Sequence, residues 1–169
     1  MAKVIWMTGL SASGKTTLAK TLQKELGESC ISLDGDVIRN MFYPIGFSKK
    51  ERDTNIGRAA YLAKILSPFF DTIICSFISP YEETRKMVQK KVEGVKVVYI
   101  KCSIDECKRR DPKGLYAKAI TGEIPHFTGI SDPYEEPNFP DLVLHTATMS
   151  IDECVKKLKD LLRDDTESV

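Results

Sequence analysis

An uninterrupted phosphate-binding pattern lies near the start of the chain. The run Gly9-Leu10-Ser11-Ala12-Ser13-Gly14-Lys15-Thr16 matches G-x-x-x-x-G-K-[ST] at every position. Its glycines let backbone N–H groups approach phosphate oxygens, and the helix that follows adds partial positive charge at its N-terminus. Lys15 is expected to neutralise the β- and γ-phosphates, and the Thr16 hydroxyl to reach Mg²⁺. The residues predicted to hold a nucleoside triphosphate are Gly9, Ser11, Ala12, Ser13, Gly14, Lys15, Thr16 and Thr17.

Two carboxylates follow the next apolar run of the sequence. Asp34-Gly35-Asp36 comes directly after residues 30–33, which read as a buried strand. A carboxylate at that end can accept a proton from an attacking hydroxyl or hold Mg²⁺, the two tasks that phosphoryl transfer leaves to side chains. We predict that Asp36 is catalytic and a metal ligand. Asp34 fits an acceptor site, and it equally fits a cap on the next helix.

Basic and aromatic residues supply candidates for nucleotide binding. Arg39 and Arg52 suit a doubly anionic acceptor because guanidinium groups pair with oxyanions in bidentate fashion, although Arg52 alone is typical of a solvated helix charge. Phe47 and Phe127 stand beside glycine or polar residues, which predicts exposed rings able to stack on a base. Arg110 ends a basic run that could bind phosphate or complement a helix dipole.

The same loop occurs in switches, motors and kinases, so other residues must choose among them. The guanine-reading Asn-Lys-x-Asp pattern is absent, and the D-x-x-G match at residues 111–114 follows a helical stretch, which disfavours a GTPase. No apolar strand ends in Asp-Glu, which disfavours a motor. A small-molecule kinase that uses ATP and Mg²⁺ remains.

Alternating short and long apolar runs predict an α/β fold. Strands are expected at residues 4–7, 30–33, 72–77, 95–101 and 142–145, because each run is brief, apolar and often β-branched. Helix starts are predicted by Ser48 with Glu51, Ser103 with Glu106, Ser150 with Glu153, and Pro80 at a first helical position. This order indicates a three-layer P-loop NTPase fold, with a five-stranded parallel sheet and helices on both faces.

Length and composition bound the remaining possibilities. The 169 residues fit a single kinase domain, in which residues 111–141 are expected to form a lid or substrate loop and residues 164–169 a frayed tail. Charged residues make up 29% and nearly cancel to +1, which argues against nucleic-acid or membrane partners. The start shows no signal peptide, and we expect a cytoplasmic protein whose five cysteines are reduced core thiols.

Together these segments resemble the adenylylsulfate kinase family. The resemblance rests on residues 9–17, Leu33-Asp34-Gly35-Asp36 with Arg39, Gly46-Phe47-Ser48 with Arg52 and Asn55-Ile56, residues 78–81, residues 111–116, and residues 127–130 with 133–135. These segments follow the family's order over nearly the whole chain. The family's kinases transfer a phosphate from ATP to adenylyl sulfate, which gives 3′-phosphoadenylyl sulfate.

The resemblance implies a role for each matching residue. Asp36 would assist attack by the ribose 3′-hydroxyl. Arg39, Arg52 and Asn55 would hold the phosphosulfate of the acceptor. Phe47 and Phe127 would enclose its adenine, and the remaining contacts would come from Ile78 and Ser79 in the pocket, Lys113 and Leu115 in the lid, and Arg110 near ATP. A homodimer is also implied.

The chain departs from the family's pattern at positions that the resemblance places on the acceptor side. Val37 stands where Asn is usual, Gly57 and Glu82 stand where Arg is usual, and residues 40–45 differ in sequence and length. A homologous kinase that phosphorylates the 3′-hydroxyl of another nucleotide ester, such as cytidine diphosphoramidate, is therefore an alternative. A nucleotide-binding regulatory protein is a further alternative, which the presence of Lys15, Thr16 and Asp36 disfavours.

Overall fold

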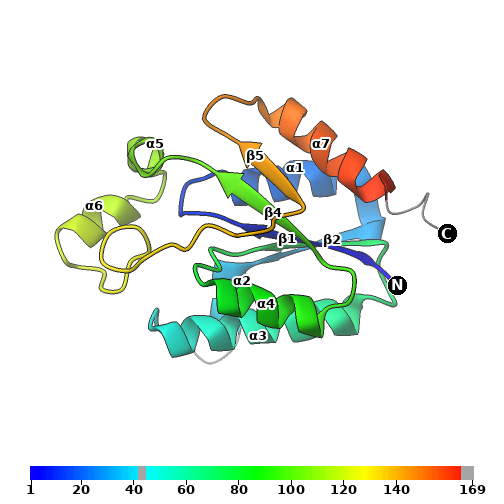
Figure 1. The fold of residues 1–169 in the computed structure, drawn as a ribbon, viewed down its shortest axis with the longest axis horizontal. Helices are drawn as coiled ribbons and strands as arrows, with labels where there is room; N and C mark the ends of the chain where they lie inside the picture. The colour runs from blue at the N-terminus through cyan, green and yellow to red at the C-terminus, as the bar shows by residue number, and fades with distance from the viewer. Residues whose placement is uncertain (42–44, 165–169) are drawn as a thin grey trace.

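A parallel sheet forms the middle layer of the computed structural model, which describes residues 1–41 and 45–164 (Figure 1). Its five strands lie in the order β2-β3-β1-β4-β5. The bounds are β1 Lys3–Thr8, β2 Cys30–Asp34, β3 Thr72–Ser76, β4 Lys96–Lys101 and β5 Leu142–His145. Each predicted strand is confirmed to within one residue at either end. The central strand β1 pairs with both β3 and β4, so the segment after Thr8 leaves the middle of the sheet.

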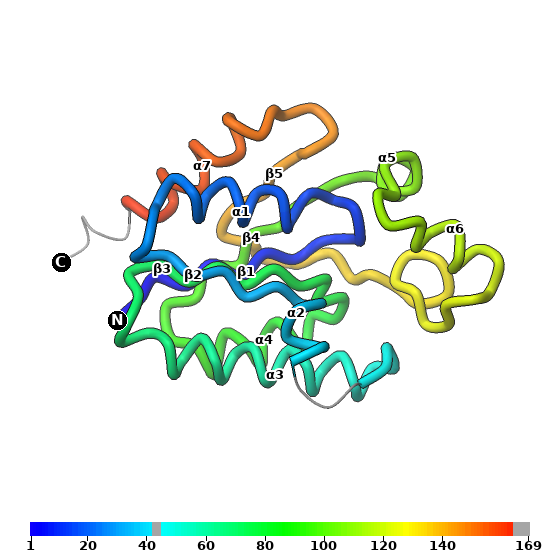
Figure 2. Tube along the Cα trace, turned by 180° about the vertical axis from the view of Figure 1, so that it is seen from behind, coloured from blue at the N-terminus to red at the C-terminus, as the bar shows by residue number. Residues whose placement is uncertain are grey.

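Helices cover both faces of the sheet, as predicted. One face carries α1 (Lys15–Leu26) and α7 (Ile151–Asp164), and the other carries α2 (Gly35–Met41), α3 (Lys49–Leu66) and α4 (Glu82–Lys91) (Figures 1 and 2). The alternation of side chains along β1 matches this arrangement, because Val4 and Trp6 pack into one apolar core while Ile5 and Met7 pack into the other. Both cores together fix the carboxyl ends of the strands.

The predicted helix starts are confirmed, with one exception. Ser48 and Glu51 form a capping box on α3, Ser103 accepts from the Glu106 N–H at α5 (Ile104–Arg110), and Ser150 with Glu153 bond in both directions at α7. The prediction that Pro80 occupies a first helical position was wrong, because α4 begins at Glu82. Ser79 has a left-handed backbone and Tyr81 an extended one, and neither conformation belongs to a helix.

The expected loop at residues 111–141 contains a short helix, α6 (Leu115–Ile120). The Asp111 carboxylate accepts the N–H groups of Tyr116 and Ala117 at 3.2 Å, which stabilises this first turn. Its apolar residues pack with α5 in a third small core beyond the sheet. Part of the segment is thus packed against α5 and the phosphate-binding loop.

The five cysteines are buried free thiols, as predicted. Residues 42–44 of the 40–45 connection, and residues 165–169 of the predicted tail, lie outside the described residues. Across the parts of the chain that the structure describes, no helix has the length and apolar character to cross a bilayer.

Candidate active site

A cavity of about 650 Å³ opens where β1, β2 and β3 end. Parallel α/β sheets bind ligands at this edge, where the strand order reverses. The cavity walls come from the phosphate-binding loop, the segments after β2 and β3, one end of α3, and residues 110–128. Segments far apart in sequence therefore meet around one space large enough for nucleotides.

The loop of residues 9–16 turns sharply between β1 and α1. Ala12 and Gly14 have positive φ angles of 62° and 108°, and α1 begins at Lys15. A Cβ atom on Gly9 would lie 2.6 Å from the Ile100 carbonyl oxygen, so only glycine fits against β4 there. The loop thus presents backbone N–H groups and a helix N-terminus to the cavity.

The Lys15 ammonium lies inside the curve of this loop. It donates to the carbonyl oxygens of Gly9 at 2.9 Å and Leu10 at 2.6 Å. Burial lowers the pKa of Lys15 to about 8, and nearby Asp34 and Asp36 only partly offset this effect. The loop therefore holds a desolvated cation that an anionic ligand would stabilise.

Thr16 and Asp34 form an oxygen-rich pair beside the loop. The Thr16 hydroxyl donates to Asp34 Oδ2 at 2.9 Å, and Asp34 Oδ1 accepts the Asp36 N–H at 2.9 Å. Asp34 thus caps the start of α2, as one sequence interpretation held. These hard oxygen donors suit Mg²⁺, which is usually held by one or two protein oxygens together with phosphates and water. The geometry connects Asp34, rather than Asp36, with Thr16.

Asp36 faces the opposite wall. Its carboxylate lies 2.8 Å from the Lys113 ammonium, which approaches from the segment between α5 and α6. The hydrogen bond to Asp36 raises the pKa of Lys113. Both side chains are exposed and line the cavity, so solvent screens this ion pair and it holds only weakly.

Two cations lie together at the other end of the cavity. Arg39 lies over the Phe47 ring at 4.2 Å, donates to the Gly46 carbonyl and leaves its buried Nε without a partner. Arg52 is only 4% exposed, and donates to the carbonyl oxygens of Phe47 at 2.8 Å and His126 at 2.5 Å. Its interpretation as a solvated helix charge was wrong, because α3 places it against the loop ahead of Phe127.

Neither arginine pairs with a carboxylate within residues 1–41 and 45–164. Burial lowers the pKa of both guanidinium groups, and the charge of Arg52 lowers the pKa of Arg39 further. Asn55 lies nearby, with its Nδ2 bonded to the Gly35 carbonyl at 3.1 Å and its buried Oδ1 unpartnered. One buried and one partly buried cation without carboxylate partners indicate a site for an anionic ligand.

The two phenylalanines differ in exposure. Phe47 is 42% exposed, as expected, whereas Phe127 is 7% exposed and packs edge-to-face on Tyr116 with ring centroids 5.0 Å apart. The expectation of an exposed Phe127 was wrong because α6 supplies Tyr116 as a partner. The Tyr116 hydroxyl donates to the Ser11 carbonyl at 2.9 Å, which ties α6 to the phosphate-binding loop.

Arg110 lines the cavity beside the phosphate-binding loop. It donates to the Thr146 carbonyl at 2.7 Å, and the Thr146 hydroxyl donates to the Ser13 carbonyl at 2.6 Å. The Glu106 carboxylate accepts from Arg110 as well, at 2.8 Å. The basic run of residues 108–110 does complete a helix, since α5 ends at Arg110. Arg110 itself also lines the cavity.

Comparison with known proteins settles the family. Residues 1–145 match the family described as adenylylsulphate kinase. The chain is 46% identical to the adenylyl-sulfate kinase of Deinococcus deserti over 164 residues, which cover 95% of this chain and 91% of that protein. The chain therefore belongs to the adenylylsulphate kinase family.

Solved structures of this family have the same fold. The Mycobacterium tuberculosis APS kinase CysC in complex with AMPPNP and APS is similar with a TM-score of 0.90 and 39% identity, covering 96% of this chain and 98% of that chain. The hexameric APS kinase from Thiobacillus denitrificans gives a TM-score of 0.71 and 28% identity, covering 98% of this chain and 29% of that one.

Nearly all of the candidate site residues line this cavity. The exceptions are Gly9 and Ser13, which shape the loop from beneath. Sequence reasoning missed several lining residues, all beside or between residues that it selected: Gly35, Ile56, Ser76, Phe77, Pro80, Asp111, Pro112, Ile124 and Thr128. Position next to a recognised motif was the available signal for most of them.

The positions that depart from the family's pattern lie outside this cavity. Val37 is exposed on α2, and Gly57 lines a separate depression between α3 and α4. Glu82 pairs with buried Arg85 instead of facing the cavity. None of these three positions contributes a side chain to the cavity lining.

Proposed function

We propose that this protein is an adenylyl-sulfate kinase, which transfers the γ-phosphate of Mg·ATP to the ribose 3′-hydroxyl of adenylyl sulfate. The products are ADP and 3′-phosphoadenylyl sulfate. The observation that carries this proposal is one cavity that joins a phosphate-binding loop to two arginines, buried Arg52 and partly buried Arg39, which have no carboxylate partner among residues 1–41 and 45–164. The whole chain, residues 1–169, acts as one kinase domain in this proposal.

The donor half binds the triphosphate of ATP. Backbone N–H groups of residues 9–17 surround its oxygens, and Lys15 exchanges its bonds to loop carbonyls for bonds to phosphate. Thr16 and Asp34 would hold Mg²⁺, with Asp36 as the further carboxylate beside them. When bound, the ion neutralises charge on the β- and γ-phosphates. Arg110 orients the nucleoside end.

The acceptor half binds adenylyl sulfate. Arg39, Arg52 and Asn55 hold the phosphosulfate, where the unpartnered Arg39 Nε and Asn55 Oδ1 gain contacts or ordered water. The adenine lies between Phe47 and Phe127. Ile78 and Ser79 form the adjoining wall, Leu115 belongs to the covering segment, and Lys113 moves from Asp36 toward bound phosphate.

The transfer step places Asp36 as the proton acceptor. The 3′-oxygen forms a bond to the γ-phosphorus as the bond from that phosphorus to the bridging oxygen of ADP breaks. The hydroxyl proton passes to Asp36, and the leaving electron pair stays on ADP. Lys15 stabilises the negative charge on the transferring group and on the leaving oxygen.

An acceptor panel tests this proposal. A coupled assay of ADP release would compare adenylyl sulfate, adenosine monophosphate and cytidine diphosphoramidate, with 3′-deoxyadenylyl sulfate as the matched control. We expect turnover with adenylyl sulfate alone, and none with its 3′-deoxy analogue. Faster turnover with cytidine diphosphoramidate would reassign the acceptor, and no turnover with any of the panel would favour a regulatory protein.

We further propose a cytoplasmic homodimer. Five buried free thiols fit a reducing compartment, and small kinases of this class bind diffusible nucleotides rather than nucleic acid or membrane. The hexameric relative indicates that chains of this family can associate.

A further inference from the structure

One wall of the cavity contains a strained residue. Ser79 has a φ of 46°, is 1% exposed, and lies between Ile78 and Pro80 in the cavity lining. A left-handed residue other than glycine costs free energy and persists only where its surroundings hold it. Its hydroxyl accepts from Trp6 Nε1 at 2.9 Å. The groups that contact its backbone therefore determine the shape of this wall.

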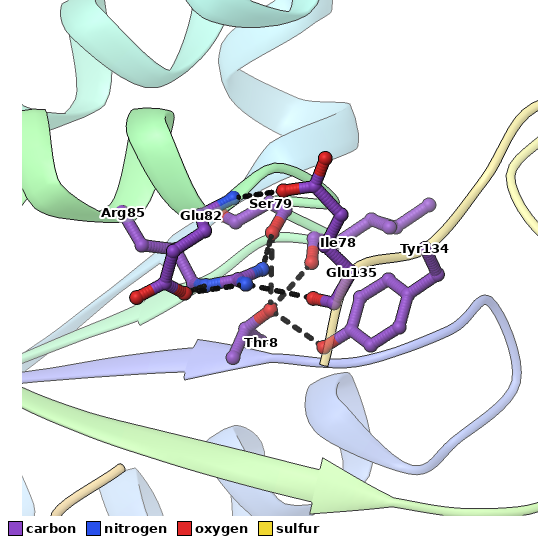
Figure 3. Close-up of polar contacts among 7 residues, drawn as sticks. All are labelled: Thr8, Ile78, Ser79, Glu82, Arg85, Tyr134 and Glu135. Atoms are coloured by element: carbon purple, nitrogen blue, oxygen red, sulfur yellow. Dashed lines mark hydrogen bonds and ion pairs between the residues drawn. The ribbon is translucent and has the colours of Figure 1, made fainter. Parts of the chain in front are cut away.

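Thr8 links this wall to a distant segment. Its hydroxyl oxygen lies 2.6 Å from the Ile78 carbonyl and 2.9 Å from the Tyr134 hydroxyl (Figure 3). A threonine hydroxyl carries one proton, and the short contact assigns that proton to Ile78. The Tyr134 hydroxyl therefore donates to Thr8. Residues 133–136, termed the return segment, are thus fastened to the end of β1.

Arg85 makes the second link between the same two parts. Its Nη1 donates to the Ser79 carbonyl at 2.6 Å, and its Nη2 donates to the Glu135 carbonyl at 2.7 Å (Figure 3). The side chain is 2% exposed and absent from the cavity lining. A planar guanidinium can bridge three acceptors at once, which a lysine cannot do with the same geometry.

Glu82 completes the arrangement. Its Oε2 accepts from Arg85 Nε at 3.1 Å and Nη2 at 2.7 Å, which gives the buried cation a counter-ion. The Glu82 N–H donates to Glu135 Oε2 at 2.7 Å, and the Glu135 N–H donates to the Pro80 carbonyl at 2.8 Å. Glu82 is a position where the chain departs from its family's pattern, and here it supplies the charge that Arg85 requires.

We propose that Arg85, with Glu82 as its counter-ion, is a positioning residue that clamps the acceptor wall to the return segment and thereby sets the affinity for the acceptor nucleotide. This inference rests on the proposed function, since that function assigns Ile78 and Ser79 to the acceptor half. The donor half has further contacts away from the clamp, those of Arg110, Thr146 and Ser13, and it joins the acceptor wall through the Gly9 N–H, which donates to the Ile78 carbonyl at 3.3 Å. Loss of the clamp should therefore weaken binding of the acceptor nucleotide more than binding of ATP.

Steady-state kinetics of Arg85→Lys test the clamp. The substitution keeps the charge and removes the three-way bridge. We expect the acceptor KM to rise by at least about fivefold while the ATP KM stays within about twofold. Glu136→Gln is the control, because Glu136 lies in the return segment and pairs with exposed Lys101 instead. Equal changes in both KM values, or an unchanged acceptor KM, would overturn the proposal.

Hydrogen exchange gives a readout that needs no activity. In the nucleotide-free protein we expect Arg85→Lys to speed exchange at the Glu82 and Glu135 amides, while amides of β4 keep their wild-type rates. Unchanged exchange at both amides would refute the clamp. If Arg85→Lys does not fold, Glu82→Gln and Tyr134→Phe decide by the same two measurements. A wild type inactive with adenylyl sulfate would instead refute the proposed function and leave the exchange result to decide the clamp.

Discussion

Asp34 and Asp36 differ in their partners, although only one residue separates them. Asp34 accepts from the Thr16 hydroxyl, whereas Asp36 pairs with Lys113 across the cavity. Sequence reasoning gave Asp36 both the proton and the metal, because the spacing could not show which carboxylate turns toward Thr16. The geometry favours a separate role for each aspartate.

Substitution of each aspartate tests these separate roles. Asp36→Ala is expected to abolish turnover and to leave ATP binding within about tenfold, because it removes the proton acceptor and no phosphate contact. Asp34→Asn is expected to raise the Mg²⁺ concentration that gives half-maximal rate. Rates and nucleotide titrations at several Mg²⁺ concentrations distinguish the two. Near-normal turnover of Asp36→Ala would remove Asp36 from the mechanism.

The lowered pKa of Lys15 predicts that the protein takes up a proton when ATP binds. Burial lowers its pKa to about 8 in the nucleotide-free protein, and phosphate oxygens favour the charged form. ATP binding should therefore take up a proton near about pH 8.5, and affinity should fall as pH rises further. Calorimetry with a non-hydrolysable ATP analogue in buffers of different ionisation enthalpy measures the uptake. Lys15→Arg, which stays charged, should show none; uptake equal to that of wild type would contradict the assignment.

At the scale of elements, the start of α3 matters because this helix carries Arg52 and Asn55. The Glu51 carboxylate accepts from the Ser48 hydroxyl at 2.5 Å and from the Gly46 and Ser48 N–H groups at 2.8 and 3.0 Å. The Ser48 hydroxyl and these two N–H groups hold the pKa of Glu51 below its usual value. The capping box therefore orders both the helix and the chain before it.

Stability should follow the ionisation of Glu51. Because its folded pKa is lowered, its stabilisation is present above the ordinary glutamate pKa of about 4.3 and is lost as pH falls through the folded value. Glu51→Gln should lower the free energy of unfolding at pH 7, and the gap to wild type should narrow in acid. Urea unfolding across pH measures this gap, with exposed Glu93→Gln as control. A gap that stays constant into acid would contradict the linkage.

The elements were easier to predict than their contacts. Strand positions and three helix starts followed from apolar periodicity and from local serine–glutamate spacing, which depend on neighbouring residues alone. The start of α4 and the burial of Phe127 depend on partners more distant in the chain, Glu135 and Tyr116. No local pattern encodes such contacts. The candidate site residues were selected from the phosphate-binding pattern, from the carboxylates that follow a strand, and from the family's motifs.

At the scale of the whole molecule, the proposed homodimer predicts a measurable mass. Light scattering after gel filtration should give twice the chain's 19.0 kDa. The value should persist on dilution if the interface is of the size found in stable dimers. A mass of one chain, or of six as in the hexameric relative, would contradict the proposal.

The central place of β1 has a consequence for synthesis on the ribosome. Lys3 of β1 lies opposite Thr72 of β3, and Ile5 lies opposite Lys96 of β4, so both neighbours emerge long after β1 itself. Contacts so distant in sequence slow folding and leave apolar strands unpaired in the meantime. A nascent chain arrested before Lys96 would leave the β4 side of β1 unpaired. Chaperones or proteases would bind that edge before the phosphate-binding loop, which follows β1, could bind ATP.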